Sequence, residues 1–434
     1  MNRYHKISQQ LFVRNRQKLL KLVPNDALVI VNSNHEQFRN GDQGFPFRQH
    51  SDLFYLTGID QADTTLLLCP SHPIPQMREI LLVLRGDKKM EIWNGHRLTK
   101  EEATEISGVD QVKFSSQKES ILVDLMYHTN TVYLNLNENL RYSSNLYHPD
   151  LEFALKFREK YPLHTYQRLA PLLTSLRLIK ESEEIELIRH ACSITASAFH
   201  RVLKFVKAGV MEYEIEAEIT HEYIRNGCSG HSYAPIVASG ADSCILHYNF
   251  NHKICKDGDI LLMDFGAEYA NYAADTTRTI PVNGVFTKRQ KSVYESVLRV
   301  KNYSESMLIP GTTLADYQKK VCKNMEHELV HLGLISTEQL AKENDNMEPE
   351  EKAFFKYYMH GTSHFLGLDV HDVGTRNIVL QPGMVVTCEP GIYIPDEQIG
   401  IRLEDEILIT SGKPENLFEN HPIDIQEIEK LMKR

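Results

Sequence analysis

The sequence lacks several features that would assign it to common protein classes. It has no uninterrupted apolar run near the ~20 residues that a membrane-spanning helix needs. It has no excess of basic residues, since 48 Lys and Arg stand against 58 Asp and Glu, whereas nucleic-acid-binding proteins usually carry a basic patch. Its seven cysteines form no CxxC pair and are odd in number, which favours reduced thiols over a disulfide framework. We therefore expect a soluble, cytoplasmic protein that binds neither membranes nor nucleic acids.

The length of the chain, 434 residues, is sufficient for two or three domains. Residues 1 to about 170 alternate between strand-like and helix-like segments, which predicts a smaller α/β domain. The strand-like runs are 27–31, 53–56, 65–69, 80–84 and 131–136. A linker-like segment then leads into a long amphipathic helix that starts at Ser182, its expected N-cap, and ends before Gly209. We expect a first domain of residues 1–174 and a second of residues 175–434.

Two aspartates interrupt a segment that otherwise reads as buried strands. Residues 260–280 are "ILLMDFGAEYANYAADTTRTI", in which Asp264 follows four apolar residues and Asp275 lies in a second strand-like run. The segment predicts a β-hairpin centred between Tyr269 and Ala270, which would place the two aspartates opposite each other, about 5 Å apart. Two ionised carboxylates at that distance in a buried site repel each other and need a positive partner.

The second domain is predicted to be internally duplicated. Each half contains two helices, a histidine-bearing segment and a strand pair. The junctions "GDILLMDFG" and "GMVVTCEPG" match in the spacing of two glycines and one acid, which is Asp264 in the first and Glu389 in the second. Glu389 and Glu404 are equidistant from the point between Asp396 and Glu397, so these glutamates should also face each other. The two halves would then bring two carboxylate pairs to one site.

Four carboxylates in one low-dielectric site carry more charge than a single divalent ion neutralises, which predicts two metal ions about 3.5–4 Å apart. The alternative is that Arg278 and Arg402 pair with these acids as structural partners. His360, His364 and His371 in "HGTSHFLGLDVH" offer a nitrogen ligand, although spacing alone does not separate a ligand from a neighbouring polar residue. Mainly oxygen ligands favour Mn²⁺ first, with Co²⁺, Mg²⁺ or a catalytic Zn²⁺ pair as alternatives.

The sequence contains five blocks that resemble, in order and spacing, those of the M24 metallopeptidases: "ILHY", "MDFGAEYANYAADTTRT", "HGTSHFLGLDVHD", "EPGIYI" and "GIRLED". The closest likeness is to aminopeptidase P, the Xaa-Pro aminopeptidases. The stretches "FRQHSDLFYLTGI" and "EIWNGHRLT" are similar to the N-terminal domain of that family. The resemblance implies an α+β chain, in which a C-terminal pita-bread domain with an internal pseudo-twofold repeat follows the smaller α/β domain.

The resemblance also implies roles for individual residues. The implied metal ligands are Asp264, Asp275, His364, Glu389 and Glu404. Among these, Asp275 and Glu404 would bridge the two ions. His360 and Arg402 match positions beside the ligands, where the planar fork of Arg402 can orient carboxylates.

Further residues are implied to contact the substrate. His247 in "ILHY" and His371 in "LDVHD" match positions that contact the substrate and the developing oxyanion, and His360 also lies at this surface. Tyr393 is a candidate wall of a proline pocket, with ordinary strand packing as the alternative. Trp93, the only tryptophan, would either approach the active site of a neighbouring subunit or pack locally.

The implied reaction is hydrolysis of the bond between the first residue of a peptide and a following proline. A hydroxide between the two metals would be the nucleophile, and Glu389 would pass its proton to the proline nitrogen. Since proline lacks a backbone N–H, such substrates need a dedicated site, and the expected partners are short peptides with proline second and further copies of the chain, as a dimer or tetramer. The alternatives are a prolidase, which cleaves Xaa-Pro dipeptides, and a non-catalytic peptide-binding module.

Overall fold

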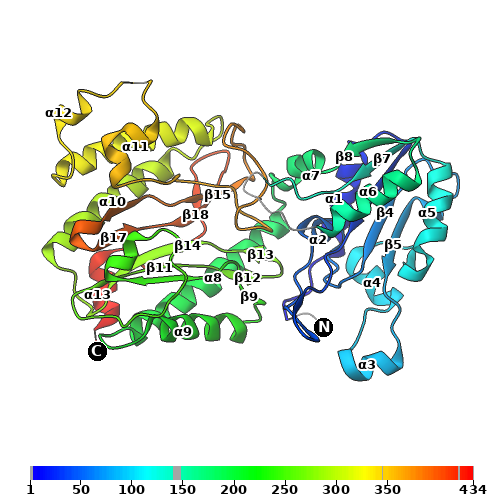
Figure 1. Ribbon diagram of the computed structural model, residues 1–434, viewed down its shortest axis with the longest axis horizontal. Helices are drawn as coiled ribbons and strands as arrows, with labels where there is room; N and C mark the ends of the chain where they lie inside the picture. Colours follow the sequence, from blue (N-terminus) through cyan, green and yellow to red (C-terminus); the bar gives the residue numbers. More distant parts are fainter. Residues whose placement is uncertain (1–2, 140–147, 345, 419–420, 434) are drawn as a thin grey trace. The chain divides into compact units, whose positions relative to one another are not determined.

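The computed structural model describes residues 3–139, 148–344, 346–418 and 421–433 (Figure 1). The chain forms two compact units: a smaller unit, Lys6–Arg177, and a larger unit, Leu178–Arg434 together with Met1–His5. Helix α7 (Ala170–Arg177) occupies most of the segment that reads as a linker, so the smaller unit extends past the position expected for the domain boundary. Within the described ranges, no helix is long and apolar enough to cross a membrane.

The smaller unit is built on a mixed six-stranded sheet with the order β6-β5-β4-β1-β7-β8. Strand β1 pairs antiparallel with β4 and parallel with β7. The strands of this unit are β1 (Ala27–Asn32), β2 (Phe38–Asn40), β3 (Gln43–Gly44), β4 (Thr65–Leu68), β5 (Glu79–Val83), β6 (Val112–Phe114), β7 (Thr131–Leu134) and β8 (Thr165–Arg168). Its other helices are α1 (Gln9–Leu20), α2 (Ser51–Thr57), α3 (Lys88–Asn94), α4 (Lys100–Ser107), α5 (Lys118–Tyr127) and α6 (Pro149–Lys160).

One predicted strand of the smaller unit is a helix. Residues 53–56 lie in α2, which begins after His50, whose ring nitrogen accepts a hydrogen bond from the backbone N–H of Asp52. The helix ends at Gly58, which has φ = 66°. A short run of apolar residues that is buried on every side shows no periodicity that would distinguish a strand from a helix. The residues that cap its two ends therefore indicate that this segment is a helix. The other four predicted strands are confirmed as β1, β4, β5 and β7.

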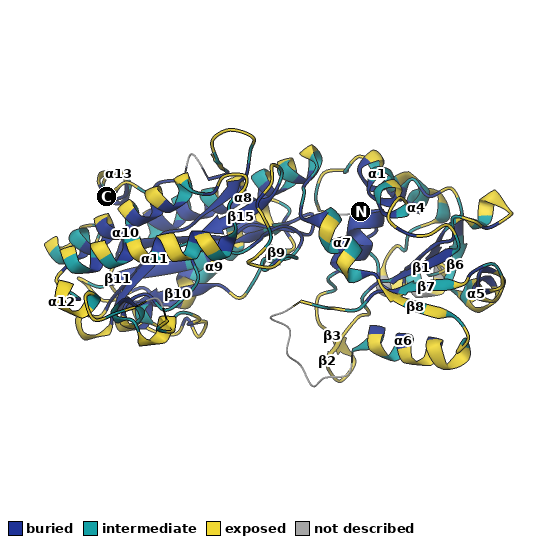
Figure 2. Ribbon diagram, turned by 90° about the horizontal axis from the view of Figure 1, so that it is seen from above, coloured by how far each residue is buried: buried dark blue, intermediate teal, exposed yellow. Residues whose placement is uncertain are grey.

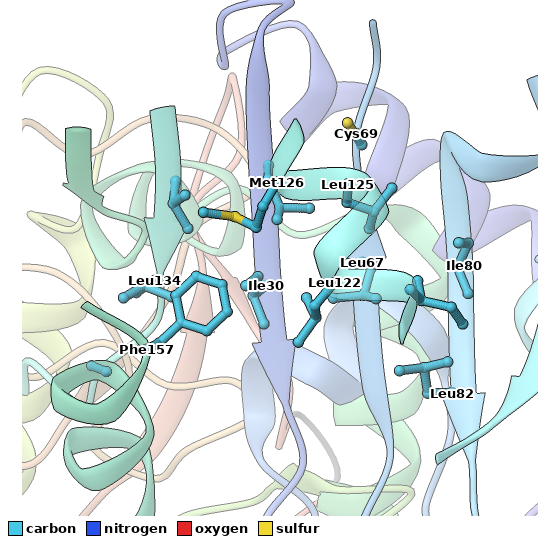
Figure 3. Close-up of a cluster of buried hydrophobic side chains, with 14 residues drawn as sticks. Ile30, Leu67, Cys69, Ile80, Leu82, Leu122, Leu125, Met126, Leu134 and Phe157 are labelled. Carbon is cyan, nitrogen blue, oxygen red and sulfur yellow. The ribbon is translucent and has the colours of Figure 1, made fainter. Parts of the chain in front are cut away.

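A cluster of apolar side chains lies between this sheet and two helices that cover it (Figure 3). Leu122 and Leu125 from α5 and Phe157 from α6 pack against sheet residues that include Ile30 and Leu67. Burial of one such side chain contributes about 1.5–3 kcal/mol. The cluster therefore fixes α5 on the sheet.

The larger unit repeats one order of elements. Helices α8 (Ser182–Phe205) and α9 (Glu212–Arg225) precede a first group of strands, and α10 (Lys288–Ser306) and α11 (Leu314–His331) precede a second. The first group is β9 (Gly230–His231), β10 (Ile236–Ser239), β11 (Ile260–Phe265), β12 (Ala267–Tyr269), β13 (Tyr272–Ala273) and β14 (Thr276–Pro281). The second is β15 (Val385–Cys388), β16 (Gly391–Ile394), β17 (Ile399–Arg402), β18 (Asp405–Leu408) and β19 (Glu415–Asn416), and the short helices α12 (Thr337–Leu340) and α13 (Ile425–Met432) lie outside this repeat.

Equivalent glycines mark the same turns in both halves. Gly209 and Gly311 follow the first helix of each half, with φ of 95° and 89°. Gly258 and Gly383 precede β11 and β15, with φ of 85° and 91°. Glycine adopts a positive φ at little energetic cost, unlike most other residues. The matching positions of these glycines are therefore evidence, visible in the sequence, of the duplication. Helix α8 begins one residue earlier than expected, because its N-cap is Glu181 and Ser182 is its first helical residue.

The strands of the larger unit are mostly buried, whereas the outward faces of α10 and α11 are exposed (Figure 2). The two halves meet along β14 and the second hairpin. The backbone N–H of Glu404 donates to the carbonyl of Thr277 at 3.0 Å, and the hydroxyl of Thr279 donates to the carbonyl of Arg402 at 3.1 Å. The ends of strands from both halves are therefore adjacent.

The predicted register of the first hairpin is wrong by two residues. Asp264 pairs with Thr277 rather than Asp275, and the two turn residues are Ala270 and Asn271, with φ of 52° and 63°. Both turn residues are left-handed, as a tight hairpin turn with the right-handed strand twist requires. Because side chains alternate with a period of two, this shift leaves both aspartates on the predicted face.

The predicted register of the second hairpin is confirmed. Cys388 pairs with Asp405 in one ladder and Gly391 pairs with Arg402 in the next, so Glu389 and Glu404 lie opposite each other between the two ladders. The turn is a short 3-10 helix, Pro395–Glu397, that ends in left-handed Gln398.

Candidate metal centre

The five predicted ligands come from strand ends and one loop of the larger unit. Asp264 lies in β11 and Asp275 immediately precedes β14, whereas Glu389 follows β15 and Glu404 precedes β18. His364 lies in the segment between α12 and β15. Ligand atoms of Asp275, His364 and Glu404 lie within 4.8 Å of one another, a spacing that a single metal ion could span.

The other two acids adjoin this group. The hydroxyl of Tyr233 lies 2.5 Å from Oδ1 of Asp264 and 2.6 Å from Oδ1 of Asp275. Nε2 of His364 lies 3.3 Å from Oδ2 of Asp275 and 3.8 Å from Oε1 of Glu389. Both pairs of acids that the duplication predicted therefore converge, one from each half of the unit.

Arg402 contacts one of the four acids directly. Its Nη2 donates to Oδ2 of Asp264 at 2.7 Å, and its Nε donates to the hydroxyl of Thr277 at 3.0 Å. The hydroxyl of Thr277 in turn donates to Oε2 of Glu404 at 2.7 Å. The alternative role of the arginines as structural partners thus holds for Arg402 and Asp264, whereas Arg278 pairs with Asp405 at 2.6 Å.

The negative charge of the site exceeds the positive charge beside it. Within the part of the chain that the structure describes, Asp275, Glu389 and Glu404 form no ion pair with lysine or arginine. Burial, with repulsion by Asp275 and Glu389, raises the pKa of Glu404 well above its usual range. Burial also raises the pKa of Glu389 to about 7 and raises that of Asp264.

The pKa of Asp275 is shifted the other way. Burial disfavours its charge, but the hydrogen bond and charge of His364 outweigh burial and lower this pKa below its usual value. The same contact raises the pKa of His364, although burial opposes the imidazolium. Excess negative charge, buried oxygen donors and one imidazole suit divalent cations, so the donor set fits the predicted metals.

His360 and Tyr393 lie beside the ligands. Nε2 of His360 lies 2.8 Å from the hydroxyl of Tyr393, which accepts a hydrogen bond from Nη1 of Arg402 at 2.9 Å. Burial and the charge of Arg402 lower the pKa of His360 to about 3, so the ring is neutral. Tyr393 is fully buried, which agrees with the strand-packing alternative for this residue.

The two histidines expected to contact the substrate differ in exposure. His371 is half-buried, and its ring meets that of His364 edge-on with centroids 4.5 Å apart. His247 is exposed, and its charge contributes to the lowered pKa of His360.

Comparison with known proteins gives the chain a family. The family model described as metallopeptidase family M24 matches residues 186–411, and that of the aminopeptidase P N-terminal domain matches residues 12–133. The chain belongs to metallopeptidase family M24. It is 37% identical over 443 residues to the Xaa-Pro aminopeptidase of Escherichia coli strain K12, with 98% of each chain covered. It is 32% identical over 446 residues to Xaa-Pro aminopeptidase 3 of Homo sapiens, covering 98% of this chain and 86% of that relative.

A solved structure agrees with the M24 assignment over the whole chain. Aminopeptidase P of E. coli with the inhibitor Pro-Leu superposes with a TM-score of 0.87 at 36% identity, and 99% of each chain is covered. The predicted resemblance and the α+β fold, with a pita-bread domain after an aminopeptidase P-type domain, are therefore confirmed. Membership of M24 makes the chain a hydrolase of the metallopeptidase class.

Sequence reasoning missed three polar residues of the M24 centre. Thr277 and Thr387 each lie two residues from a predicted ligand, so the period of two along a strand could have placed them on the same face. The hydroxyl of Thr387 accepts from the backbone N–H of His364 at 3.1 Å and lies 3.4 Å from Oε1 of Glu389. Tyr233 precedes β10 in an irregular segment, where no periodicity marks it.

Proposed function

We propose that the chain is an Xaa-Pro aminopeptidase, which removes the first residue of a short peptide whose second residue is proline. The observation that carries this proposal is the convergence of four carboxylates and His364 in the larger unit. The similarity of the chain to an Xaa-Pro aminopeptidase, with 98% of each chain covered, supports it. A prolidase shares this chemistry, so the length of the substrate separates the two activities.

In the proposed site, five residues hold two divalent cations: Asp264, Asp275, His364, Glu389 and Glu404. Asp275 and Glu404, together with His364, would contribute ligand atoms to this pair of cations. The chemistry that such cations supply when bound is activation of water at neutral pH and polarisation of a carbonyl. Mn²⁺ is the preferred cation, because four of the five side chains offer oxygen; Co²⁺, Zn²⁺ and Mg²⁺ are alternatives.

Five side chains have separate roles in the proposed reaction. Glu389 accepts a proton from the attacking water and delivers it to the proline nitrogen when the peptide C–N bond breaks. His247 and His371 donate hydrogen bonds to the oxygen that gains negative charge. Arg402 and His360 hold the acids and Tyr393 in place through the contacts described above.

The proposed assembly is a homo-oligomer in the cytoplasm. Ile92 and Trp93 on α3 are 82% and 83% exposed, and adjacent exposed apolar side chains are typical of contact surfaces. This supports the reading in which Trp93 reaches a neighbouring subunit rather than packing locally.

The experiment compares an Xaa-Pro dipeptide, an Xaa-Pro-Yaa tripeptide and an Xaa-Ala-Yaa tripeptide with Mn²⁺-loaded protein. Release of the first residue from the Xaa-Pro-Yaa peptide alone is the expected result. Hydrolysis of the dipeptide alone would show that the protein is a prolidase. If no peptide is hydrolysed after chelation and return of Mn²⁺, the enzyme proposal is wrong and the non-catalytic peptide-binding module is favoured. The Glu389→Gln variant should lower kcat by about 10²–10⁴-fold, the usual contribution of proton transfer.

A further inference from the structure

A second group of metal-ligating side chains lies in the smaller unit. It consists of His72, Asp124 and His128, whose ligand atoms lie within 4.8 Å of one another. The metallopeptidase reaction proposed above uses none of these residues, so this inference is independent of that proposal.

Two elements bring the three side chains together. His72 lies in the turn between β4 and β5, where its backbone N–H donates to the carbonyl of Cys69 at 3.1 Å. Asp124 lies in α5 and His128 is the C-cap of that helix, four residues later. Residues four apart project from the same side of a helix, so α5 presents two ligands toward the turn that holds the third.

His72 is the buried member of the group. Its side chain is 0% exposed, and its Nε2 has no hydrogen-bond partner among the residues that the structure describes. Oδ2 of Asp124 lies 3.3 Å away, within ion-pair distance but without hydrogen-bond geometry. A buried polar atom without a partner is costly and needs an explanation.

A metal ion would explain both this distance and the orphaned nitrogen. In a tetrahedral site with bonds of ~2.1 Å, neighbouring ligand atoms are about 3.4 Å apart, close to the 3.3 Å between His72 and Asp124. Nδ1 of His72 lies 3.2 Å from both the carbonyl and the backbone N–H of Ile74. A metal-bound histidine usually donates its other ring N–H to such a carbonyl, so an ion on Nε2 would select the carbonyl as the partner of Nδ1.

The remaining features favour a cation over a hydrogen-bonded cluster. The rings of His72 and His128 meet edge-on with centroids 4.6 Å apart, which is close enough for one ion to bind a nitrogen of each ring. The C-terminal end of α5 carries the negative end of the helix dipole, which also attracts a cation. The Asp124 side chain is 48% exposed, so an ion can enter from solvent.

We propose that His72, Asp124 and His128 form a second metal site, which binds a divalent transition-metal ion and ties the β4–β5 turn to the end of α5. Two imidazoles and one carboxylate select Zn²⁺, Ni²⁺ or Cu²⁺ over Mg²⁺ or Ca²⁺. With three protein ligands, a fourth position remains for water.

The test measures zinc per chain by elemental analysis after dialysis of the full-length protein against buffered Zn²⁺. Wild type should retain one more zinc per chain than His128→Gln or Asp124→Asn, because the larger unit keeps its own ligands in all three proteins. A zinc titration should show at least about tenfold weaker binding at this site in His128→Gln, since even residues behind the ligands cost that much when mutated. Asp124 is exposed and His128 is half-buried, so both variants carry less folding risk than a substitution of fully buried His72.

The matched control is His96→Gln. His96 forms an exposed pair with Glu102 in the same unit, at 2.7 Å between Nε2 and Oε2, and should keep the zinc content of wild type. Equal zinc in wild type, His128→Gln and Asp124→Asn would overturn the proposal, as would the same loss in His96→Gln. Mn²⁺-loaded His128→Gln should hydrolyse the Xaa-Pro-Yaa peptide at the rate of wild type. The hydrolysis assay therefore tests the proposed peptidase activity independently of the zinc measurement, which tests the second metal site.

Discussion

Arg402 connects three parts of the candidate metal centre through one planar side chain. Its three nitrogens contact Asp264, Tyr393 and Thr277, at 2.7, 2.9 and 3.0 Å. A lysine ammonium is a point charge on a flexible stem and cannot reproduce this fork. The position of Asp264 therefore depends on the shape of the guanidinium as well as on its charge.

Arg402→Lys should lower kcat/KM toward an Xaa-Pro-Yaa peptide by about 10–100-fold, the range expected when a residue that orients ligands is changed. Arg289→Lys is the control, because Arg289 also makes a two-nitrogen contact, with exposed Glu397, and surface pairs contribute little. Wild-type kinetics in Arg402→Lys would show that its charge alone is sufficient.

Tyr233 places one hydroxyl between two carboxylates that repel each other. In Tyr233→Phe, both acids lose this contact, so the metal-free protein should lose about 1–3 kcal/mol of unfolding free energy, the cost of unsatisfied buried groups. With Mn²⁺ bound, the loss of unfolding free energy should be smaller, because the cation then interacts with the carboxylates in place of the hydroxyl. Denaturant unfolding with and without Mn²⁺ measures the difference.

Tyr294→Phe provides the comparison for Tyr233→Phe. The buried hydroxyl of Tyr294 donates to the carbonyl of Ile423 at 2.7 Å, so its removal should cost the same with and without Mn²⁺. If the cost of Tyr233→Phe is also independent of Mn²⁺, the hydroxyl does not serve the metal centre.

The residues of the centre are predictable to the extent that they follow symmetry or periodicity. The duplication and the strand patterns predict that Asp264, Asp275, Glu389 and Glu404 share one site, and the structure brings their side chains close together. Tyr233 lies in an irregular segment, and only the folding of that segment against the strands brings its hydroxyl to Asp264 and Asp275. Such a residue cannot be predicted from a periodic pattern in the sequence.

At the scale of elements, the first hairpin shows how a turn sets the register of the strands. With Ala270 and Asn271 as the turn, Gly266 lies opposite Asp275. A Cβ atom at Gly266 would overlap the carbonyl oxygen of Ala274. The strand therefore approaches its partner closely at the point where Asp275 enters the site.

Gly266→Ala should destabilise the protein by about 3 kcal/mol or more, as forced overpacking of a tight contact does, and should abolish hydrolysis because Asp275 moves. Gly209→Ala is the control: Gly209 has φ = 95° and open space around it, so only the backbone cost of about 1–2 kcal/mol applies. Thermal unfolding and Xaa-Pro-Yaa hydrolysis are measured for both. Equal effects of the two substitutions would contradict the close approach at Gly266.

The two hairpins differ in how far the sequence determined them. The turn "IPDEQIG" contains proline and residues that tolerate a left-handed conformation, and its centre gave the correct register. In "EYANYA" the only turn signal is Asn271, and centring the hairpin on the aspartates shifted the register by two residues. The helix α2 was missed for a related reason, since its four apolar residues suit either structure.

At the scale of the whole molecule, the metal centre concentrates charge in a chain that already carries a formal net charge of −10. Glu389, Glu404 and Asp264 all have raised pKa values in the folded protein. Such groups bind more protons in the folded than in the unfolded state, so their contribution to stability is present at low pH and is lost as the pH rises through the folded pKa.

For Glu389, whose pKa rises from 4.5 to about 7, this loss falls between pH 4.5 and 7 and is up to about 3 kcal/mol. Metal-free wild type should therefore lose stability across this range relative to metal-free Glu389→Gln. Because cations compete with protons for the carboxylates, Mn²⁺ should raise Tm more at pH 8 than at pH 5. Thermal melts of both proteins at the two pH values check this, and a Tm increase by Mn²⁺ that is larger at pH 5 would contradict it.

The hydrogen bonds that close the metal centre join residues far apart in the sequence. Arg402 and Asp264 are 138 positions apart, and Thr277 and Glu404 are 127 positions apart. During synthesis on the ribosome, the first pair of acids therefore lacks its counterpart until Arg402 and Glu404 have emerged. A nascent chain cannot assemble the site early, so a newly made molecule can complete the site only after both halves of the larger unit have been synthesised.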